Sequence, residues 1–225
     1  MGRHITLTAA DGFKLAGYRA DPNDGATRPK GCLVVLQEIF GVNHHMRAVT
    51  DRFAEMGYAA LAPALFDRTE RGIDIGYDKE AMDRGVKLRA AIPLEATLKD
   101  VAAAVAELTG LGKIGVIGYC WGGSLAFLSA TRLSGIACAV GYYGGMIAAH
   151  ATERPKVPTL LHFGEQDHGI PLTDVEKVKK ARPDVEIHTY PAGHGFSCDE
   201  RPSFDKASHE KALARTTAFL KSHIG

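Results

Sequence analysis

The sequence lacks the features of membrane proteins and of proteins that bind nucleic acid. It holds no apolar run of about 18 residues, and Met1 to Asp11 contain no apolar secretory core. The formal net charge is only +1, from 27 basic and 26 acidic residues, and no long block carries a single sign. Nucleic acid and anionic membrane surfaces are bound through an excess of positive charge. We therefore expect a cytoplasmic protein that acts on a small molecule, with no nucleic acid or membrane as partner.

Cysteine is scarce and dispersed. The four cysteines stand at positions 32, 120, 138 and 198, and no two form a Cys-x-x-Cys pair. This spacing argues against a disulfide scaffold and against a zinc cluster, so reduced thiols are expected. Histidine is more frequent, but the neighbours His44 and His45 diverge on a helix, and His209 lacks the second histidine of a zincin motif. The sequence predicts no metal site and no cofactor, and the glycine patterns of dinucleotide and phosphate loops are missing too.

Composition and the order of apolar segments predict one α/β domain that spans residues 1–225. With 45% hydrophobic residues, the chain is long enough to bury a full core. Strand and helix patterns alternate after residue 31, which is typical of a mainly parallel, doubly wound sheet with helices on both faces. The predicted strands of this sheet are residues 31–37, 58–62, 114–117, 136–142, 158–163 and 185–190. The predicted helices are residues 43–56, 79–91, 94–109, 122–132, 175–181 and 203–223.

The segment before residue 31 has a different pattern. Residues 5–9 and 15–20 alternate polar and apolar side chains around Asp11 and Gly12. This alternation predicts an antiparallel hairpin at the edge of the sheet. Residues 21–30 are expected to form a polar loop, and residues 66–77 a polar, irregular segment.

One strand-to-helix junction, within residues 113–127, has the pattern of a nucleophile elbow. Gly118 and Gly122 flank Cys120 in the spacing Gly-x-nucleophile-x-Gly. Glycine is required on both sides because the helix turns back close to the strand, where a Cβ would collide. A thiol at the start of a helix has its anion favoured by unpaired backbone N–H groups and by the helix dipole. Most single cysteines are small buried hydrophobes, so the interpretation depends on the other loops.

Three further loops at the carboxyl ends of predicted strands carry reactive side chains, namely Glu38, Asp167 and His194. In a sheet of this kind, functional residues gather at that edge. The chain order nucleophile, acid, histidine is that of an α/β-hydrolase, and it predicts a triad of Cys120, Asp167 and His194. Cys120 would attack a carbonyl carbon, His194 would exchange protons with the thiol and the leaving group, and Asp167 would orient the imidazole.

The same loops offer backbone donors for the oxyanion that forms during the attack. The N–H of Trp121 follows the nucleophile, and the N–H of Ile39 follows an early strand. An α/β-hydrolase stabilises the negative charge from these two positions. Four other titratable residues have structural interpretations, as histidines inside strand patterns and aspartates at a helix start and in a turn. They are His162, His188, Asp174 and Asp184.

These residues make the chain resemble the dienelactone hydrolase family, the carboxymethylenebutenolidases, which are small cysteine enzymes of the α/β-hydrolase fold. The matching segments are residues 37–43 (Gln-Glu-Ile-Phe-Gly-Val-Asn), 118–123 (Gly-Tyr-Cys-Trp-Gly-Gly), 141–144 (Gly-Tyr-Tyr-Gly), 164–167 (Gly-Glu-Gln-Asp) and 192–196 (Ala-Gly-His-Gly-Phe). The resemblance implies an enol-lactone hydrolase that opens a ring through a thioester, without cofactor or metal. It also implies that Glu38 interacts with Cys120 in the resting enzyme until substrate rearranges the pair. The other interpretation of Glu38 is a helix cap.

The resemblance is weaker where the substrate is selected. Family members hold the carboxylate of dienelactone with two arginines, one shortly after the catalytic histidine and one before the elbow. Here the first position is Cys198 and the second is Met82. Arg201 and Arg84 lie close enough in the sequence to substitute, and a guanidinium matches a carboxylate in shape and charge. Tyr143 is carried over as a wall of the substrate pocket.

Three functions stay open at this point. The leading prediction is a hydrolase of small lactones of the dienelactone type, acting as a monomer or a small homo-oligomer. The second is a broader carboxylesterase or thioesterase whose substrate is neutral or differently charged. The third is a hydrolase-like thiol sensor or binding protein in which Cys120 is oxidised reversibly. A sensor does not need an acid that orients a histidine, so the presence of Asp167 speaks against the third.

Overall fold

The computed structural model describes residues 2–22 and 28–225, so the polar loop predicted over residues 21–30 lies partly outside the described residues. In this part of the chain, eight strands form one sheet in the order β1-β2-β4-β3-β5-β6-β7-β8. The pairs that β2 makes with β1 and β4 are antiparallel, and the other pairs are parallel. The mainly parallel sheet and its N-terminal hairpin are thereby confirmed. The strands are β1 (Arg3–Thr8), β2 (Lys14–Ala20), β3 (Cys32–Leu36), β4 (Ala59–Pro63), β5 (Ile114–Tyr119), β6 (Cys138–Tyr142), β7 (Thr159–Gly164) and β8 (Glu186–Tyr190).

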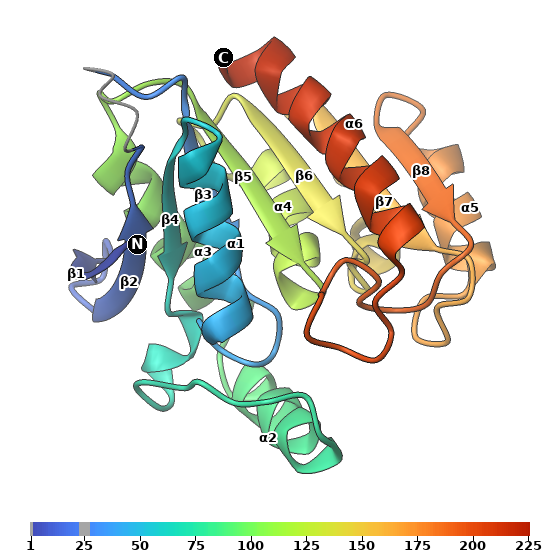
Figure 1. Ribbon diagram of the computed structural model, residues 1–225, viewed down its shortest axis with the longest axis horizontal. Coiled ribbons are helices and arrows are strands. Elements are labelled where there is room, and N and C mark those ends of the chain that lie inside the picture. Colours follow the sequence, from blue (N-terminus) through green and yellow to red (C-terminus); the bar gives the residue numbers. More distant parts are fainter. Residues whose placement is uncertain (1, 23–27) are drawn as a thin grey trace.

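Helices cover both faces of the sheet, as predicted (Figure 1). One face carries α1 (His44–Glu55) and α6 (Lys206–Ile224). The opposite face carries α3 (Leu94–Leu108), α4 (Trp121–Arg132) and α5 (Leu172–Ala181). Right-handed crossovers account for the division among the helices that connect parallel strands, because the chain moves along the sheet in one direction from β3 to β4 and in the other from β4 onward to β8. A separate helix, α2 (Lys79–Ala90), protrudes beyond the body of the sheet at the end where the site lies (Figure 1).

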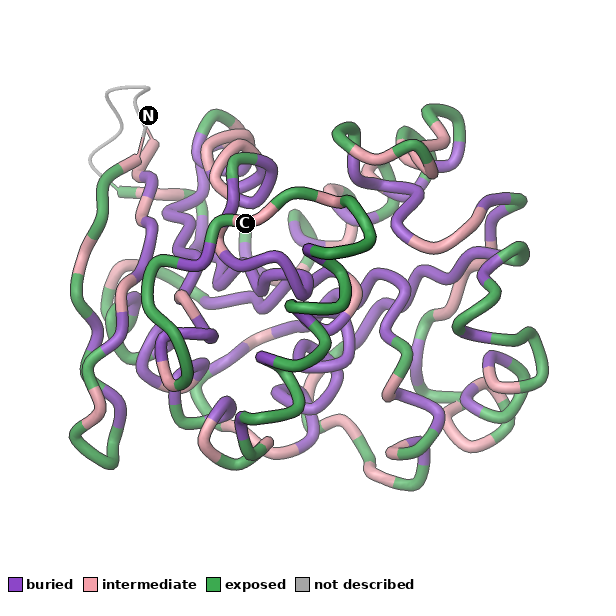
Figure 2. The backbone as a smooth tube through the Cα atoms, turned by 90° about the horizontal axis from the view of Figure 1, so that it is seen from below, coloured by how far each residue is buried: buried purple, intermediate pink, exposed green. Residues whose placement is uncertain are grey.

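The central strands are buried on both faces, which explains their continuous apolar sequence. Successive side chains of β3 point to opposite sides and enter different clusters. Leu33 and Val35 pack in the cluster that includes α1 and α6. Cys32, Val34 and Leu36 pack in the cluster that includes α3. Figure 2 shows the result as a buried interior surrounded by exposed turns and outer helix faces.

Side-chain caps fix the starts of three helices. A carboxylate or amide oxygen accepts a hydrogen bond from a backbone N–H three residues on, at 3.1 Å for α1 and 2.8 Å for both α2 and α6. Each cap of this kind contributes about 1 kcal/mol to helix stability. The capping residues are Asn43, Asp78 and Asp205.

The predicted bounds differ from the observed ones mainly at helix starts and in short 3-10 turns. Helix α5 begins at Leu172 instead of residue 175, because Leu172 is exposed and adds nothing to the apolar stripe that the prediction used. Helix α6 begins only at Lys206, where the Asp205 cap lies. Short 3-10 turns form at η1 (Leu65–Arg68), where the irregular segment begins, and at η2 (Ile147–His150). None of the helices in the described residues is long and apolar enough to cross a bilayer.

A buried polar network joins α6 to the sheet. His162 on β7 lies 2.8 Å from the Tyr190 hydroxyl through Nδ1 and 3.0 Å from the Thr216 hydroxyl through Nε2. The Tyr142 hydroxyl lies 2.6 Å from the same threonine. Burial lowers the pKa of His162 to about 3, and the positive charges of His188 and Arg215 add to the effect. The imidazole is therefore neutral at physiological pH, as a structural histidine in a strand should be.

Candidate active site

The predicted elbow lies between β5 and α4. Cys120 has φ 54° and ψ −113°, a left-handed backbone conformation that a non-glycine residue adopts only under strain of about 1–3 kcal/mol. A Cβ at Gly118 would overlap the Gly122 carbonyl, and a Cβ at Gly122 would overlap the Leu36 carbonyl on β3. Both glycines are therefore required sterically, for the reason that the sequence suggested. The turn places Cys120 directly before the first residue of α4, where backbone N–H groups favour an anion.

Asp167 and His194 meet at the carboxyl ends of β7 and β8. His194 Nδ1 lies 2.7 Å from Asp167 Oδ2, and the other carboxylate oxygen accepts from the backbone N–H of Gly169 at 2.8 Å. The Asp167 side chain is fully buried, whereas that of His194 is 29% exposed. The aspartate holds the tautomer with hydrogen on Nδ1, which leaves Nε2 to exchange a proton with another group.

The imidazole of His194 is electrostatically tuned toward its protonated form. Burial lowers its pKa, but hydrogen bonds to Asp167 and to the Cys120 thiol, together with the charges of these two groups, raise it to about 10. The structure therefore pairs His194 with Asp167 and places Cys120 near enough to affect the histidine, while the catalytic triad itself stays a prediction. The geometry supports a histidine that can hold a proton beside a thiolate, which is the charge state that a cysteine nucleophile needs.

The two predicted oxyanion donors flank the elbow. Trp121 is the first residue of α4, so its N–H has no partner within the helix. The loop after β3 is tied to the elbow by a hydrogen bond from the Gly122 N–H to the Gln37 carbonyl at 3.0 Å. Gly85 of α2 packs so closely on the Ile39 carbonyl that a Cβ would overlap it. Helix α2 thus packs on the peptide that follows Ile39, and the role of both N–H groups in catalysis stays a prediction.

Glu38 has an arginine as its partner. Arg201 Nη1 donates to Glu38 Oε1 at 3.1 Å, and the side chains are only 11% and 2% exposed. The guanidinium also lies over the rings of Phe40 and Tyr77, at 5.5 and 5.7 Å from their centroids. The guanidinium can lie beside position 195 only because that residue is glycine, since a Cβ there would collide with it. The predicted contact of Glu38 with the thiol stays a prediction, since this structure pairs Glu38 with Arg201.

The two candidate arginines are placed differently. Arg201 is enclosed beside the loop of His194, whereas Arg84 is exposed on α2 and pairs with Glu70. Met82, at the position of the family's earlier arginine, is 38% exposed on the same helix. The structure thus pairs Arg201 with a carboxylate of the chain itself, while substrate binding by Arg201 and by Arg84 stays a prediction.

Tyr143 lies against the histidine. Its ring centroid is 5.1 Å from that of His194, and its backbone has a positive φ of 39°. The side chain is completely buried, and its hydroxyl has no hydrogen-bond partner among the described residues. A buried hydroxyl without a partner costs about 1–3 kcal/mol, so a bound substrate that accepts from it would recover part of that cost.

Sequence reasoning missed Tyr77 and the contact that Asn43 makes with it. Asn43 Nδ2 donates to the Tyr77 hydroxyl at 3.0 Å, besides capping α1. Cys198 lies beneath the site, where burial and the Glu38 charge raise the pKa of its thiol to about 12 and a hydrogen bond with Tyr77 opposes them. It is therefore a protonated, space-filling thiol. The sequence held a signal for the Asn43 cap, but none for its partner 34 residues away.

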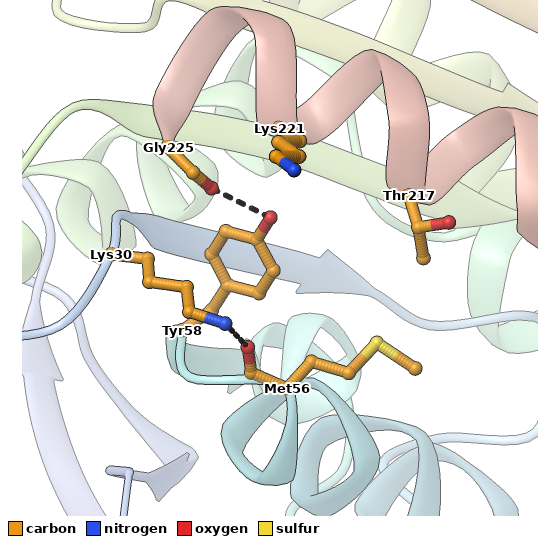
Figure 3. Close-up of a pocket in the computed structure, with 6 residues that line it drawn as sticks. All are labelled: Lys30, Met56, Tyr58, Thr217, Lys221 and Gly225. Carbon is orange, nitrogen blue, oxygen red and sulfur yellow. Dashed lines mark hydrogen bonds between the residues drawn. The ribbon is translucent and has the colours of Figure 1, made fainter.

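A second pocket lies away from the predicted catalytic residues. A pocket of about 580 Å³ is lined by residues that precede β3 and β4 and by α6, at the amino ends of the strands (Figure 3). Ligands of open α/β sheets bind at the opposite end, and no predicted catalytic residue lines this pocket. The described residues also contain no group of three or more side chains that could hold a metal ion. The lining residues of the pocket are Lys30, Met56, Tyr58, Thr217, Lys221 and Gly225.

Comparison with known proteins agrees with this geometry. The model of the dienelactone hydrolase family matches residues 15–224. A Synechocystis protein assigned to the carboxymethylenebutenolidases is 35% identical over 232 residues, covering 94% of this chain and 93% of that protein. The carboxymethylenebutenolidase of Pseudomonas putida is 33% identical over 227 residues, covering 96% of this chain and 94% of that enzyme. A crystal structure of a Klebsiella pneumoniae protein assigned to the dienelactone hydrolases has a TM-score of 0.84 at 26% identity, covering 97% of this chain and 98% of that one. The chain belongs to the dienelactone hydrolase family and is a hydrolase of ester or lactone bonds.

Proposed function

We propose that this enzyme opens small enol-lactones by forming a thioester on Cys120. The observation that carries the proposal is the convergence of three loops, which pairs His194 with Asp167 at 2.7 Å and brings it close enough to Cys120 for the thiol to raise the pKa of His194. A thiol, a histidine and an orienting acid in this arrangement are the parts of a nucleophilic acyl-transfer site. The name of the Pseudomonas putida relative, carboxymethylenebutenolidase, supports a lactone as the substrate.

The reaction proceeds in two balanced halves. His194 takes the proton of the Cys120 thiol, and the thiolate attacks the lactone carbonyl carbon while the N–H groups of Ile39 and Trp121 donate to the oxyanion. The ring C–O bond then breaks, and the enolate oxygen receives the proton from His194. In the second half, His194 takes a proton from water, the hydroxide attacks the thioester, the C–S bond breaks, and the leaving thiolate takes the proton back from His194. The products are the opened acid and the regenerated thiol.

The position of Arg201 favours a substrate that carries its own carboxylate group. Its guanidinium is buried, is already paired with a carboxylate and lies beside the loop of His194. A substrate carboxylate can compete with Glu38 for the same donors, because both present two oxygens to a planar fork. Displaced from Arg201, Glu38 would be a buried carboxylate without its partner. It would then gain by accepting a proton, which links substrate binding to activation of the thiol.

A second candidate is a broader esterase whose substrates are uncharged. The observation that favours it is the surface of α2, where Met82 and Val86 are exposed one turn apart and Arg84 is paired with Glu70. With only Arg201 buried in the site, a substrate carboxylate would meet one guanidinium instead of two. Such a site would discriminate less strongly in favour of anionic lactones.

The test compares turnover of dienelactone with turnover of a neutral p-nitrophenyl ester. We expect dienelactone to be the better substrate, and Cys120→Ala to abolish turnover of both. Arg201→Gln should lower kcat/KM for the lactone about 10-fold to 100-fold more than kcat/KM for the ester, because the charge pair forms only with the substrate carboxylate. Arg89→Gln, which removes an exposed arginine of α2, is the control. If the enzyme turns over the ester but not dienelactone, and Arg201→Gln leaves the ester turnover unchanged, the second candidate is favoured.

A further inference from the structure

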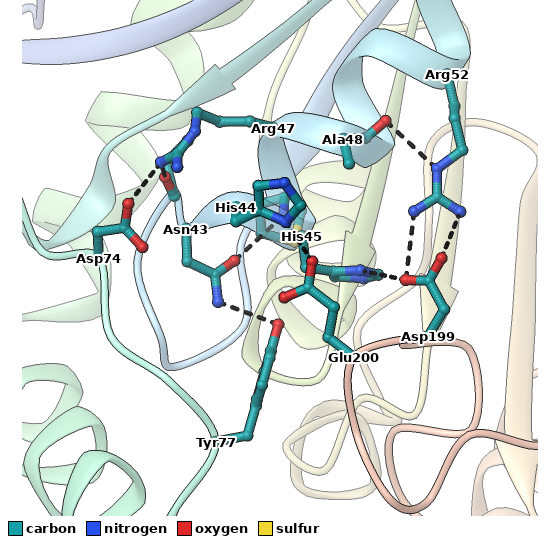
Figure 4. Close-up of polar contacts among 12 residues, drawn as sticks. Asn43, His44, His45, Arg47, Ala48, Arg52, Asp74, Tyr77, Asp199 and Glu200 are labelled. Carbon is teal, nitrogen blue, oxygen red and sulfur yellow. Dashed lines mark hydrogen bonds and ion pairs between the residues drawn. The ribbon is translucent and has the colours of Figure 1, made fainter.

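A cluster of polar contacts joins the start of α1 to the loop between β8 and α6 (Figure 4). His45 Nδ1 lies 2.9 Å from Asp199 Oδ1. Arg52, two turns further along α1, binds the same carboxylate, with Nη1 3.2 Å from Oδ2. The Arg52 Nε also donates to the Ala48 carbonyl at 3.4 Å, which holds the guanidinium against its own helix. Asp199 is therefore held from two sides by side chains of a single rigid helix.

A neighbouring pair looks similar but is differently exposed. His44 pairs with Glu200, and its side chain is 80% exposed. The His45 side chain is only 1% exposed, although the two histidines are adjacent. Exposed ion pairs contribute about 0–1 kcal/mol, because solvent screens them. A buried imidazole that loses its partner is left unsatisfied, which costs more. Between the same two segments the chain thus has one contact whose histidine is buried, with Asp199 43% exposed, and one whose histidine is exposed.

The segments that this contact joins both carry residues of the site. Asp199 lies two positions before Arg201, and the Arg201 N–H donates to the Cys198 carbonyl in a tight turn around it. On the other side, α1 follows directly on the loop that carries Glu38, and its cap Asn43 binds Tyr77 beneath the Arg201 guanidinium. Fixing Asp199 to α1 therefore fixes the backbone from which Arg201 extends relative to Glu38.

We propose that His45, Arg52 and Asp199 are positioning residues that hold the Arg201 guanidinium where it meets an anionic substrate group. This inference rests on the role of Arg201 in the proposed function. Arginine has a long side chain, and its fork binds a carboxylate well only when its base is fixed. A displacement of about 1 Å in such a group is enough to cost a large factor in rate. The clamp, meaning these three residues, acts through Arg201 and does not touch the substrate.

The test uses alkylation of Cys120, which needs no turnover of any lactone. Iodoacetate and iodoacetamide both react as the thiolate displaces iodide, but only iodoacetate carries a carboxylate. The ratio of their rates therefore measures how well the site receives an anion. The other three cysteines are completely buried, and mass spectrometry of the labelled peptide restricts the measurement to Cys120. Arg201→Gln gives the ratio of the iodoacetate rate to the iodoacetamide rate in the absence of the guanidinium. We expect this ratio to be about tenfold lower than in the wild type.

The clamp variants are expected to move the same ratio. Asp199→Asn and His45→Ala should lower it about fivefold, toward that of Arg201→Gln, while His45→Asn, which keeps a donor near Nδ1, should stay within about twofold of the wild type. His44→Ala is the matched control and should leave the ratio unchanged. A ratio unchanged in Asp199→Asn and His45→Ala, with only the melting temperature lowered, would show a structural contact and overturn the clamp. If Asp199→Asn does not fold, His45→Ala decides alone.

The same variants separate a failed clamp from a failed function. If Arg201→Gln itself leaves the ratio unchanged, Arg201 does not receive anions, and the role that the proposed function gives to Arg201 falls together with the clamp. If Arg201→Gln lowers the ratio and the clamp variants do not, only the clamp falls. With dienelactone as substrate, the clamp variants should lower kcat/KM by about the same factor, because the substrate carboxylate is held less well.

Discussion

Helix α2 provides a test in which local propensity and tertiary packing predict opposite signs. Gly85→Ala replaces a glycine inside this helix, a change that stabilises an isolated helix by about 1 kcal/mol. In the structure, however, the new Cβ would lie under 3.0 Å from the Ile39 carbonyl, a separation that real Cβ atoms do not show. The obstacle is backbone and cannot rotate away. Either α2 or the loop after β3 must move, by about 1 Å, at a cost of about 1–3 kcal/mol.

The displacement should affect catalysis as well as stability. Ile39 carries one of the two proposed oxyanion donors, and loss of one such donor lowers kcat about 100-fold to 1,000-fold in other enzymes. We expect Gly85→Ala to lower kcat for a p-nitrophenyl ester at least about tenfold. The packing cost of about 1–3 kcal/mol, less the gain of about 1 kcal/mol from helix propensity, leaves a net loss of up to about 2 kcal/mol. The melting temperature should therefore fall by up to about 8 °C, since about 1 kcal/mol corresponds to about 2–4 °C in a chain of this size.

A matched control lies just before the same helix. Gly76 has open space around the position of a new Cβ and no positive φ, so Gly76→Ala should leave kcat unchanged and the melting temperature equal or slightly higher. The assay is a thermal melt together with initial ester hydrolysis rates for the three proteins. A Gly85→Ala enzyme that melts higher than the wild type and retains full kcat would refute the packing argument.

Three further predictions concern single side chains. Asp167→Asn should lower kcat about 100-fold to 10,000-fold and lower the pKa of His194, because the hydrogen bond and charge that raise it are lost; esterase kinetics and NMR titration check this. Acidification from pH 6.5 to 5 should reduce the free energy of unfolding by about 2 kcal/mol more in the wild type than in His162→Gln. The reason is that the imidazole has a pKa of about 3 in the folded protein, whereas in the unfolded chain it takes up a proton near pH 6.5. Urea melts at the two pH values check this. Tyr143→Phe should leave stability equal or up to about 1 kcal/mol higher and raise KM for the lactone, because its hydroxyl has no partner in the described residues until substrate binds; urea melts and kinetics check this.

Each of these has an outcome that contradicts it. Full activity in Asp167→Asn would remove the acid from the triad. The sign of the His162 effect follows from the lowered pKa of the folded state. The free energy of unfolding that the neutral imidazole contributes is fully present above pH 6.5 and is lost as the pH falls toward 3. Equal pH dependence in wild type and His162→Gln would therefore show that the imidazole is not buried neutral. A Tyr143→Phe enzyme that is less stable, with unchanged KM, would show that the hydroxyl has a structural partner.

Much of the candidate site could be predicted because its determinants are local. The elbow needs small residues at Gly118 and Gly122, and this steric demand is visible as spacing in the sequence. Asp167 and His194 each follow a strand, so the topology of a parallel sheet brings them to one edge. The divergence of His44 and His45 was likewise foreseen from helical periodicity, and the side chains are 80% and 1% exposed.

Partners that are distant in the chain could not be predicted from the sequence. Nothing in the spacing distinguishes Arg201, which pairs with Glu38 from 163 residues away, from Arg84, which pairs with Glu70. The contact of His45 with Asp199 spans 154 residues and has no sequence signature. Such pairs depend on where loops of several residues run, and loop paths follow from packing against many elements at once.

The sequence by itself determined the order of strands and helices, the elbow and the reactive side chains at one edge of the sheet, because alternation, helical period and turn residues act over a few positions. Only the tertiary structure decided which arginine is enclosed, that Glu38 pairs with it, and that α1 holds the loop from which it extends. Those outcomes depend on desolvation and on hydrogen-bond partners brought together by folding, and neither is encoded at any single stretch of the chain.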